Sequence, residues 1–186
     1  MNKLLYPFGV FFLLAVIAFI AHKPQETCDQ ANCLVADTLI MTEHGCIQIS
    51  QLDNQKHAIM FLNSKMEIAY TKNYKVRQTG KVELLYLFRL ENGHSILGTG
   101  DHKIAFNNSN KKDGFGFNPL RNTNAFDLDC VTLAWDRTDP KLAYDKVKEC
   151  KKQLLTEGQM IWALKNEDDC YKKEGNFFAN GILVHD

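Results

Sequence analysis

Residues Gly175–Asp186 read GNFFANGILVHD, two short apolar runs separated by Asn180-Gly181 and followed by His185. An Asn-Gly pair between apolar runs predicts a β-hairpin, because both central residues of the favoured turn have positive φ. Chain ends are usually polar and loosely held, whereas these runs are apolar. We therefore expect this hairpin to be packed into the core of a folded domain.

Length and composition indicate one domain with a short appendage. The chain has 186 residues, 45% of them hydrophobic, and its 22 basic side chains balance 22 acidic ones. This length suits a single domain, and the apolar fraction argues against a disordered chain. Because the net charge is zero, nothing electrostatic favours a nucleic acid as partner, and we expect none.

The appendage is the stretch Leu4–Ala21, which carries no charged side chain. Such a stretch is typical of an export signal or of a short single-pass anchor. We assign residues 1–21 to a signal peptide or membrane anchor and residues 22–32 to a polar linker, and both alternatives stay open. In either case we expect the domain on the exocytoplasmic side, exported or membrane-anchored, with Leu4–Ala21 contacting the membrane if it is not cleaved.

Six cysteines are compatible with several bonding patterns. They are Cys28, Cys33, Cys46, Cys130, Cys150 and Cys170. An even number in an exported chain permits three disulfides, but if one cysteine is kept for chemistry, the other five cannot all pair. Their spacing does not resemble that of a zinc site. We expect no metal and no cofactor.

Short apolar segments between turn residues predict an all-β domain. The expected strands are Leu34–Met41, Ile47–Leu52, Ala58–Leu62, Ile68–Arg77, Val82–Leu90, Ser95–Leu97 and Met160–Lys165. A second Asn-Gly turn, with Gly93 at its centre, joins the fifth and sixth of them. A segment ending in Leu-Asp precedes a strand both at 49–62 and at 125–134, which suggests two half-domains related by pseudo-symmetry.

One α-helix is expected within this β domain. Asp139-Pro140 suits a helix start, because Asp is a good N-cap and Pro is favoured at the first helical position. Lys141–Leu155 carries one apolar stripe among charged residues, and Gly158 suits the helix end. We treat residues 107–158 as a variable insertion that contains this helix.

Three clusters could carry chemistry: Cys33 with the residues after it, the segment 93–102, and the terminal hairpin with His185. A cysteine is an effective nucleophile, and a nearby histidine can set its protonation state and protonate a leaving amide nitrogen. Read structurally, Cys33 is a buried or disulfide-bonded cysteine and His102 an ordinary loop histidine. No Gly-x-Ser-x-Gly or papain-like context is present.

Together the clusters resemble the Hint domains of inteins, bacterial intein-like domains and hedgehog proteins. Cys33-Leu-Val-Ala-Asp37-Thr38 is similar to their opening block, and the segment 91–102 resembles their Thr-x-x-His block. Residues 176–185, NFFANGILVH, resemble their closing blocks. The resemblance covers about 33–106 and 166–186. It implies a pseudo-symmetric, horseshoe-like β fold over residues 33–186, with Asp37, Thr38, Gly93, Asn180 and Gly181 as structural motif residues.

The resemblance also implies roles for site residues. The Cys33 thiol would attack the carbonyl of Asn32, converting the Asn32–Cys33 peptide bond to a thioester. His102 would protonate the Cys33 nitrogen, Thr99 would hydrogen-bond in the same pocket, and Asp168 would supply a further acid. The substrate would be the chain's own N-terminal segment, and water or a small thiol would break the thioester in a single turnover.

Two departures from the family bear on the closing step. Splicing needs a terminal asparagine that cyclises, followed by a Cys, Ser or Thr, whereas here Asp186 ends the sequence. The histidine that many members carry before Asn-Phe-Phe is Gly175. We therefore expect self-cleavage without splicing, with His185 kept as a structural or vestigial member of the site.

Two other interpretations remain open. A degenerate Hint fold could serve as an exported or anchored binding module, and a Cys28–Cys33 disulfide would silence the nucleophile. Alternatively, the chain could be a cysteine hydrolase that acts on other molecules, although no third catalytic residue is evident. The acceptor of the thioester, which could be water, a thiol or a lipid hydroxyl, is also left open.

Overall fold

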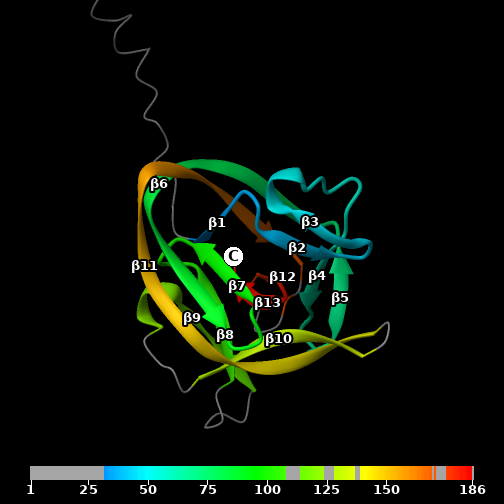
Figure 1. Ribbon diagram of the computed structural model, residues 1–186. Coiled ribbons are helices and arrows are strands. Elements are labelled where there is room, and N and C mark those ends of the chain that lie inside the picture. The colour runs from blue at the N-terminus through cyan, green and yellow to red at the C-terminus, as the bar shows by residue number, and fades with distance from the viewer. Residues whose placement is uncertain are drawn as a thin grey trace, which may run out of the picture.

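The structure, a computed structural model, describes residues 32–107, 114–123, 128–136, 139–168, 170 and 175–185. These residues form thirteen strands and two short 3-10 helices, and all the strands join in one sheet (Figure 1). The prediction of an all-β domain is confirmed. Residues 1–21, assigned to a signal or anchor, lie outside the described part, in which no helix is long and apolar enough to cross a membrane.

Up to Gly98 most residues of the expected strands are strands, but the expected strands 34–41 and 68–77 are each divided in two, and 49–51 form a 3-10 helix. The elements are β1 (Cys33–Val35), β2 (Leu39–Thr42), β3 (Gly45–Gln48), η2 (Ile49–Gln51), β4 (Ile59–Leu62), β5 (Ile68–Thr71), β6 (Tyr74–Leu90), β7 (Ser95–Gly98), β8 (Lys103–Asn107), β9 (Phe115–Pro119), η3 (Leu120–Asn122), β10 (Asp129–Asp136), β11 (Asp139–Asn166), β12 (Asn176–Ala179) and β13 (Ile182–His185).

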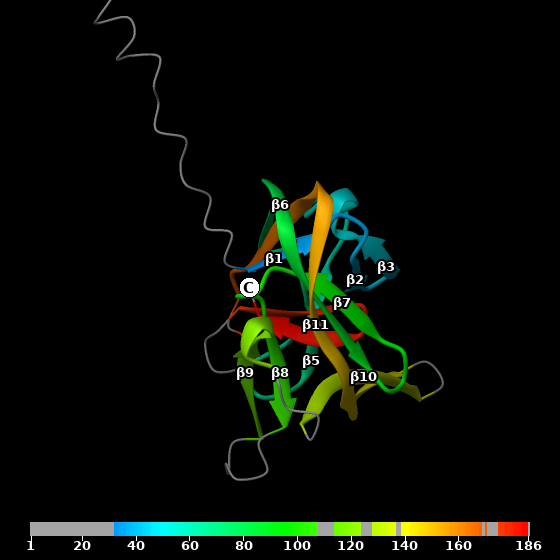
Figure 2. The same cartoon turned by 60° about the vertical axis from the view of Figure 1, so that its left-hand side comes forward.

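The sheet curls around its own terminal hairpin. Its main path runs β1-β7-β6-β11-β10-β8-β13-β12-β2-β4-β5, so the last two strands lie in the middle of the order. In Figures 1 and 2 the long strands β6 and β11 arch around one side, and β12 and β13 lie inside the curve. This arrangement surrounds β12 and β13 with strands from both halves of the chain.

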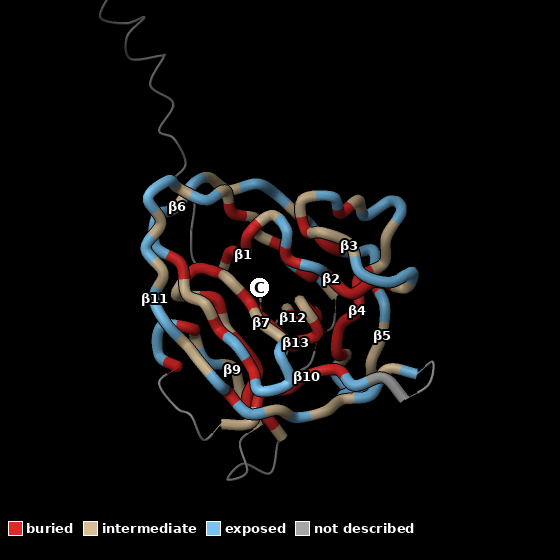
Figure 3. Tube along the Cα trace, viewed as in Figure 1, coloured by how far each residue is buried: buried red, intermediate tan, exposed pale blue. Residues whose placement is uncertain are grey.

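The terminal hairpin is as buried as its sequence predicts. β12 pairs with β13, and all eight of their residues are buried (Figure 3). Asn180 and Gly181 have φ of 49° and 77°, the positive values that the favoured two-residue turn requires. The segment therefore forms part of the core, which accounts for its apolar composition.

The prediction of a helix over Lys141–Leu155 is wrong, because these residues belong to β11, a strand of 28 residues. The first part of β11 pairs with β10, and the part from Val147 to Asn166 pairs with β6. Strand pairing with the neighbouring β10 and with the distant β6 outweighs the local helix signals of Asp139-Pro140 and the apolar stripe. The described residues of the stretch 107–158 are therefore strands of the same sheet together with η3.

Candidate functional site

Cys33 is the first residue of β1 and lies at the centre of the candidate site. β1 is held between β7 and β11: Leu34 is opposite Gly98, and Cys33 is opposite Ala163. The Cys33 side chain is fully buried, among Val35, Leu85 and Ile161. The peptide bond that enters this strand, Asn32–Cys33, is thereby fixed against the interior of the sheet.

Thr99 forms hydrogen bonds with both the amide N–H and the carbonyl of Cys33. The Cys33 amide N–H donates to Thr99 Oγ1 at 3.1 Å, and the Thr99 amide N–H donates to the Cys33 carbonyl at 2.9 Å. Gly98 makes this approach possible, because a Cβ at this position would lie 2.9 Å from the Cys33 carbonyl oxygen. The sequence predicts Thr99 but not Gly98, whose requirement arises from the opposite strand.

His102 is fully buried beside this pair of hydrogen bonds. Its amide N–H donates to the Thr99 carbonyl at 3.1 Å, and its carbonyl accepts from Leu120 at 2.9 Å. The imidazole packs edge-on to Phe177 of the terminal hairpin, with ring centroids 6.4 Å apart. Neither ring nitrogen hydrogen-bonds to another residue in the described part of the chain. The ring is thus positioned by packing and keeps both nitrogens available.

The electrostatic surroundings keep the His102 imidazole neutral. Burial, and secondarily charge on His185, lower the pKa of His102 to about 3, and the backbone carbonyl of Asn32 acts in the opposite direction. A buried cation without a partner is strongly disfavoured, which explains the direction of the shift.

His185 extends the site into the terminal hairpin. It is opposite Lys103, the neighbour of His102, in the pairing of β13 with β8. Its ring is largely buried and lies edge-on to Phe117, with centroids 5.2 Å apart. The structure therefore brings residues 33, 99, 102 and 185 to one region, although they are spread over most of the chain.

Comparisons with known proteins give the fold and no closer assignment. No protein-family model matches the chain, and no curated protein sequence does. Among solved structures, the DnaX mini intein from Spirulina platensis matches with a TM-score of 0.64 at 20% identity, covering 83% of this chain and 100% of that one. The bacterial intein-like domain from Clostridium thermocellum gives a TM-score of 0.60 at 20% identity, with 83% and 99% covered. The chain has a Hint fold.

A third solved structure agrees with this assignment. A DnaB intein from Synechocystis sp. PCC 6803 matches with a TM-score of 0.62 at 22% identity, covering 82% of this chain and 96% of that one. The resemblance seen in the short sequence blocks thus extends over the folded domain. At this level of identity the likeness concerns the fold, and the chemistry has to be argued from the residues of this chain.

In this Hint fold Asp168 lies just beyond the end of β11. Its carboxylate accepts from Asn73 Nδ2 at 3.0 Å, and its amide N–H donates to Asn166 Oδ1 at 3.1 Å. The first bond joins it to the turn between β5 and β6, and the second joins it to the end of β11. The described contacts of Asp168 do not include Cys33 or His102, so its role as a further acid stays a prediction.

The five structural motif residues take positions that suit turns and strand ends. Asp37 is exposed in the turn after β1, and Thr38 is buried at the end of that turn, where its carbonyl accepts from Ile49. Gly93 has a φ of 94° in the β6–β7 turn. Asn180 Oδ1 accepts from the Leu39 amide at 2.8 Å, and its Nδ2 donates to the Ser95 carbonyl at 2.7 Å.

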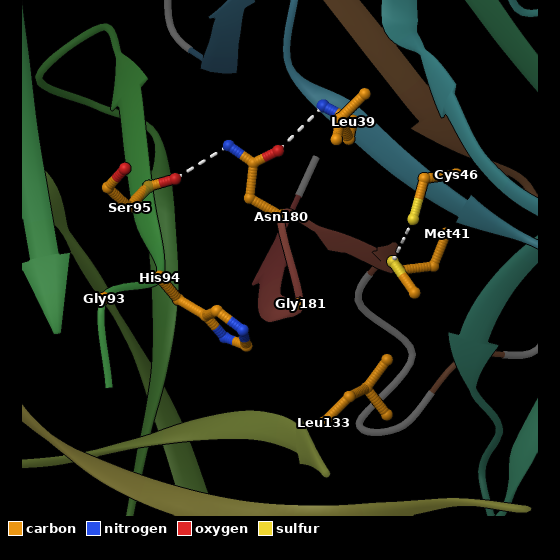
Figure 4. A pocket seen from close by; sticks show the side chains of 9 residues that line it. All are labelled: Leu39, Met41, Cys46, Gly93, His94, Ser95, Leu133, Asn180 and Gly181. Atoms are coloured by element: carbon orange, nitrogen blue, oxygen red, sulfur yellow. Dashed lines mark hydrogen bonds between the residues drawn. The ribbon is translucent and has the colours of Figure 1, made fainter. Parts of the chain in front are cut away.

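A cavity of about 440 Å³ lies beside the turn of the terminal hairpin (Figure 4). It is lined by Leu39, Met41, Cys46, Gly93, His94, Ser95, Leu133, Asn180 and Gly181. The Cys46 thiol donates to Met41 Sδ at 3.3 Å on its wall. Its lining contains none of Cys33, Thr99 and His102, so this cavity is separate from the candidate site.

Sequence reasoning missed one polar neighbour of the Cys33 sulfur, Thr79. Its Oγ1 lies 3.3 Å from Cys33 Sγ and donates to the Ile161 carbonyl at 3.2 Å. Thr79 lies in the middle of β6, 46 residues after Cys33. Nothing in the local sequence marks it, because its position beside the sulfur depends on how β6, β11 and β1 are paired.

Proposed function

We propose that this Hint-fold domain cleaves its own Asn32–Cys33 bond by an N–S acyl shift at Cys33, without splicing. The observation that supports it most directly is the arrangement around that bond: Thr99 accepts from the Cys33 amide at 3.1 Å, and the fully buried His102 donates its amide N–H to the Thr99 carbonyl at 3.1 Å. A thiol, a fixed amide and an available imidazole are the groups that such a shift requires.

In the proposed reaction the Cys33 sulfur bonds to the carbonyl carbon of Asn32, and the bond from that carbon to the Cys33 nitrogen breaks. The proton of the thiol ends on the departing nitrogen, which becomes a free amine. His102 is suited to hand this proton to the departing nitrogen, because its lowered pKa keeps it neutral at rest and makes it a strong donor once it is protonated. A positioned acid–base group of this kind contributes about 10²–10⁴-fold in rate.

The thioester is then broken by water or by a small thiol, which releases the segment that ends at Asn32. The substrate is the chain's own N-terminal segment, so each molecule turns over once. If Leu4–Ala21 is retained as a membrane anchor, cleavage frees the domain from the membrane. If that stretch is an export signal removed earlier, the cleavage shortens the linker alone.

The residue after His185 argues against a splicing step. Asp186 carries a carboxylate, which lacks the amide nitrogen that asparagine uses to attack its own carbonyl. His185 is then proposed to shape the pocket of His102 through packing and charge. The proposal is therefore limited to chemistry at the first residue of β1.

A non-catalytic binding module is the second candidate, and the separate cavity beside the terminal hairpin favours it. Such a module would bind a partner between the β6–β7 turn and the Asn180-Gly181 turn. The complete burial of Cys33 argues against a cysteine hydrolase that acts on other molecules, because an external substrate has no access to the sulfur.

The test compares the masses of the full chain and of its Cys33→Ala variant, with Cys46→Ala as the matched control for an exposed cysteine. We expect dithiothreitol or hydroxylamine to yield a fragment that begins at Cys33 from the wild-type chain and from Cys46→Ala, and none from Cys33→Ala. An Asn32–Cys33 bond that stays intact in all three chains would overturn the proposal.

A further inference from the structure

A β-bulge places Thr79 toward the Cys33 sulfur. Ile161 of β11 is opposite Gly80, but the next residue, Trp162, is opposite Gln78, so Thr79 is the extra residue of β6. Gly80 has a φ of 149°, which side chains rarely adopt and which accommodates this irregularity. Bulges of this kind commonly re-aim a side chain next to an active site.

The contacts of Thr79 define the direction of its hydrogen bonds. The hydroxyl donates its one proton to the Ile161 carbonyl at 3.2 Å, and its oxygen lies 3.3 Å from Cys33 Sγ. A hydroxyl has one proton and two lone pairs, so while it donates to Ile161 it can only accept from the thiol. While the hydroxyl donates to Ile161, the Cys33 thiol is therefore the donor to Thr79 Oγ1 of β6.

We propose that Thr79 is a further catalytic residue, which orients the Cys33 thiol at rest and donates to the sulfur once it ionises. This inference rests on the acyl shift proposed above. When the thiol proton leaves for His102, rotation of the Thr79 hydroxyl turns its proton from the Ile161 carbonyl to the sulfur. When the sulfur bonds to the Asn32 carbon, its charge is lost and the hydroxyl returns to Ile161.

The energetic reason lies in the charge on the sulfur. A hydrogen bond to an ionised group is roughly twice as strong as one between neutral groups, and Cys33 is buried away from water. The hydrogen bond that Thr79 donates is therefore stronger when the thiolate accepts it than when the Ile161 carbonyl accepts it. Removing the hydroxyl should make ionisation of Cys33 harder, even though an acceptor of the neutral thiol is removed as well.

Two substitutions separate this role from packing. Thr79→Val keeps the shape of the side chain but removes the hydroxyl, whereas Thr79→Ser keeps the hydroxyl and removes a methyl group. Thr156→Val is the matched control, because Thr156 is an exposed threonine on β11, the strand paired with β6. A role in packing alone would make Ser the more damaging substitution at position 79.

The first readout is the pH dependence of dithiothreitol-induced cleavage in the full chain. We expect Thr79→Val to slow cleavage about 10- to 100-fold at neutral pH, because a hydrogen bond to a charged group is lost. The pH at which the cleavage rate increases should move upward by about one unit. We expect Thr79→Ser to stay much closer to the wild type. A wild-type pH profile in Thr79→Val would overturn the inference.

The second readout does not need cleavage. In a His102→Gln background, which is expected to keep the Asn32–Cys33 bond intact, the ¹³Cβ chemical shift of Cys33 is followed against pH by NMR. Thr79→Val should move the ionisation midpoint about one pH unit upward, whereas Thr79→Ser and Thr156→Val should not. An unmoved midpoint refutes the role of Thr79, and absence of cleavage in the wild-type chain refutes the acyl shift.

Discussion

At the scale of single residues, the site depends on a fixed amide more than on an exposed nucleophile. Thr99 forms hydrogen bonds with both the N–H and the carbonyl of Cys33, and Gly98 allows the two backbones to approach. These bonds fix the backbone of Cys33, the residue on the carboxyl side of the Asn32–Cys33 bond. This fixed backbone is the feature on which the proposed acyl shift depends.

His102 should make the folded state sensitive to acid. Its pKa is about 3 in the folded protein and about 6.5 in an unfolded chain, so the unfolded state binds more protons between these values. The stability that this group contributes is complete above pH 6.5 and is lost as the pH falls toward 3. Between pH 7 and pH 5 the loss amounts to about 2 kcal/mol.

We expect the His102→Gln variant to lack this part of the pH dependence. Urea unfolding at pH 7 and at pH 5 should show the wild-type chain losing about 2 kcal/mol more than the variant. Titration of the other side chains is common to both proteins and cancels in the comparison. Equal losses in the two proteins would show that His102 is not held neutral in the folded state.

At the scale of elements, the terminal hairpin depends on the conformation of its turn. Gly181 has a φ of 77°, and a Cβ there would lie 2.7 Å from Cε1 of His94. The Gly181→Ala variant should therefore lose about 2 kcal/mol or more in the free energy of unfolding, from left-handed strain and the clash together.

The matched control for this variant is Gly116→Ala in β9. A Cβ at Gly116 would meet no atom within 4 Å, and the φ of Gly116 is not in the left-handed region. Its free energy of unfolding should stay within about 0.5 kcal/mol of the wild-type value. Denaturant unfolding of both variants checks the expectation, which fails if alanine is tolerated equally at the two sites.

At the scale of the whole molecule, Asn176 joins strands that are far apart in sequence. Its Oδ1 accepts from the Leu62 amide at 2.8 Å, its Nδ2 donates to the Leu62 carbonyl at 3.0 Å, and its own carbonyl accepts from Asn166 Nδ2 at 2.8 Å. Asn176 is fully buried. One side chain thus links β12 to the end of β4, with β11 attached to the same residue.

Asn176→Ala should destabilise the fold strongly, because it leaves the Leu62 amide and carbonyl buried without their present partners. Each such group costs about 1–3 kcal/mol, so we expect a loss of about 2–4 kcal/mol in urea unfolding. Asn118→Ala, on the exposed side of β9, is the matched control and should change stability by less than about 0.5 kcal/mol. A loss for Asn176→Ala as small as that of the control would contradict the link.

The pairing of strands across the whole molecule explains which parts of the fold could be predicted from the sequence. Strands such as β4, β7 and the terminal hairpin follow from local apolar runs and Asn-Gly turns, and these predictions are confirmed. β11 could not be predicted, because its local signals favour a helix and its strand state comes from pairing with β6 and β10. Non-local pairing decides between helix and strand where the local preference is weak.

The residues of the candidate site likewise fall into those that the sequence indicates and those that it does not. Cys33, Thr99 and His102 stand in sequence blocks of recognisable type, and the structure brings them together. Gly98 and Thr79 carry no such mark, because one is needed by the carbonyl of a facing strand and the other is aimed by a bulge. Their importance arises from the spacing between strands, which no short stretch of sequence encodes.

The sequence by itself determined the β class of this protein, its buried terminal hairpin and the residues for which we propose thioester chemistry. Apolar alternation, turn chemistry and side-chain reactivity are local properties, so they can be inferred residue by residue. Only the tertiary structure decided that residues 141–155 are a strand, that His102 is buried and neutral, and that Thr79 contacts the sulfur. Burial and long-range pairing depend on the whole chain, since they are set by the closure of the sheet around its last two strands.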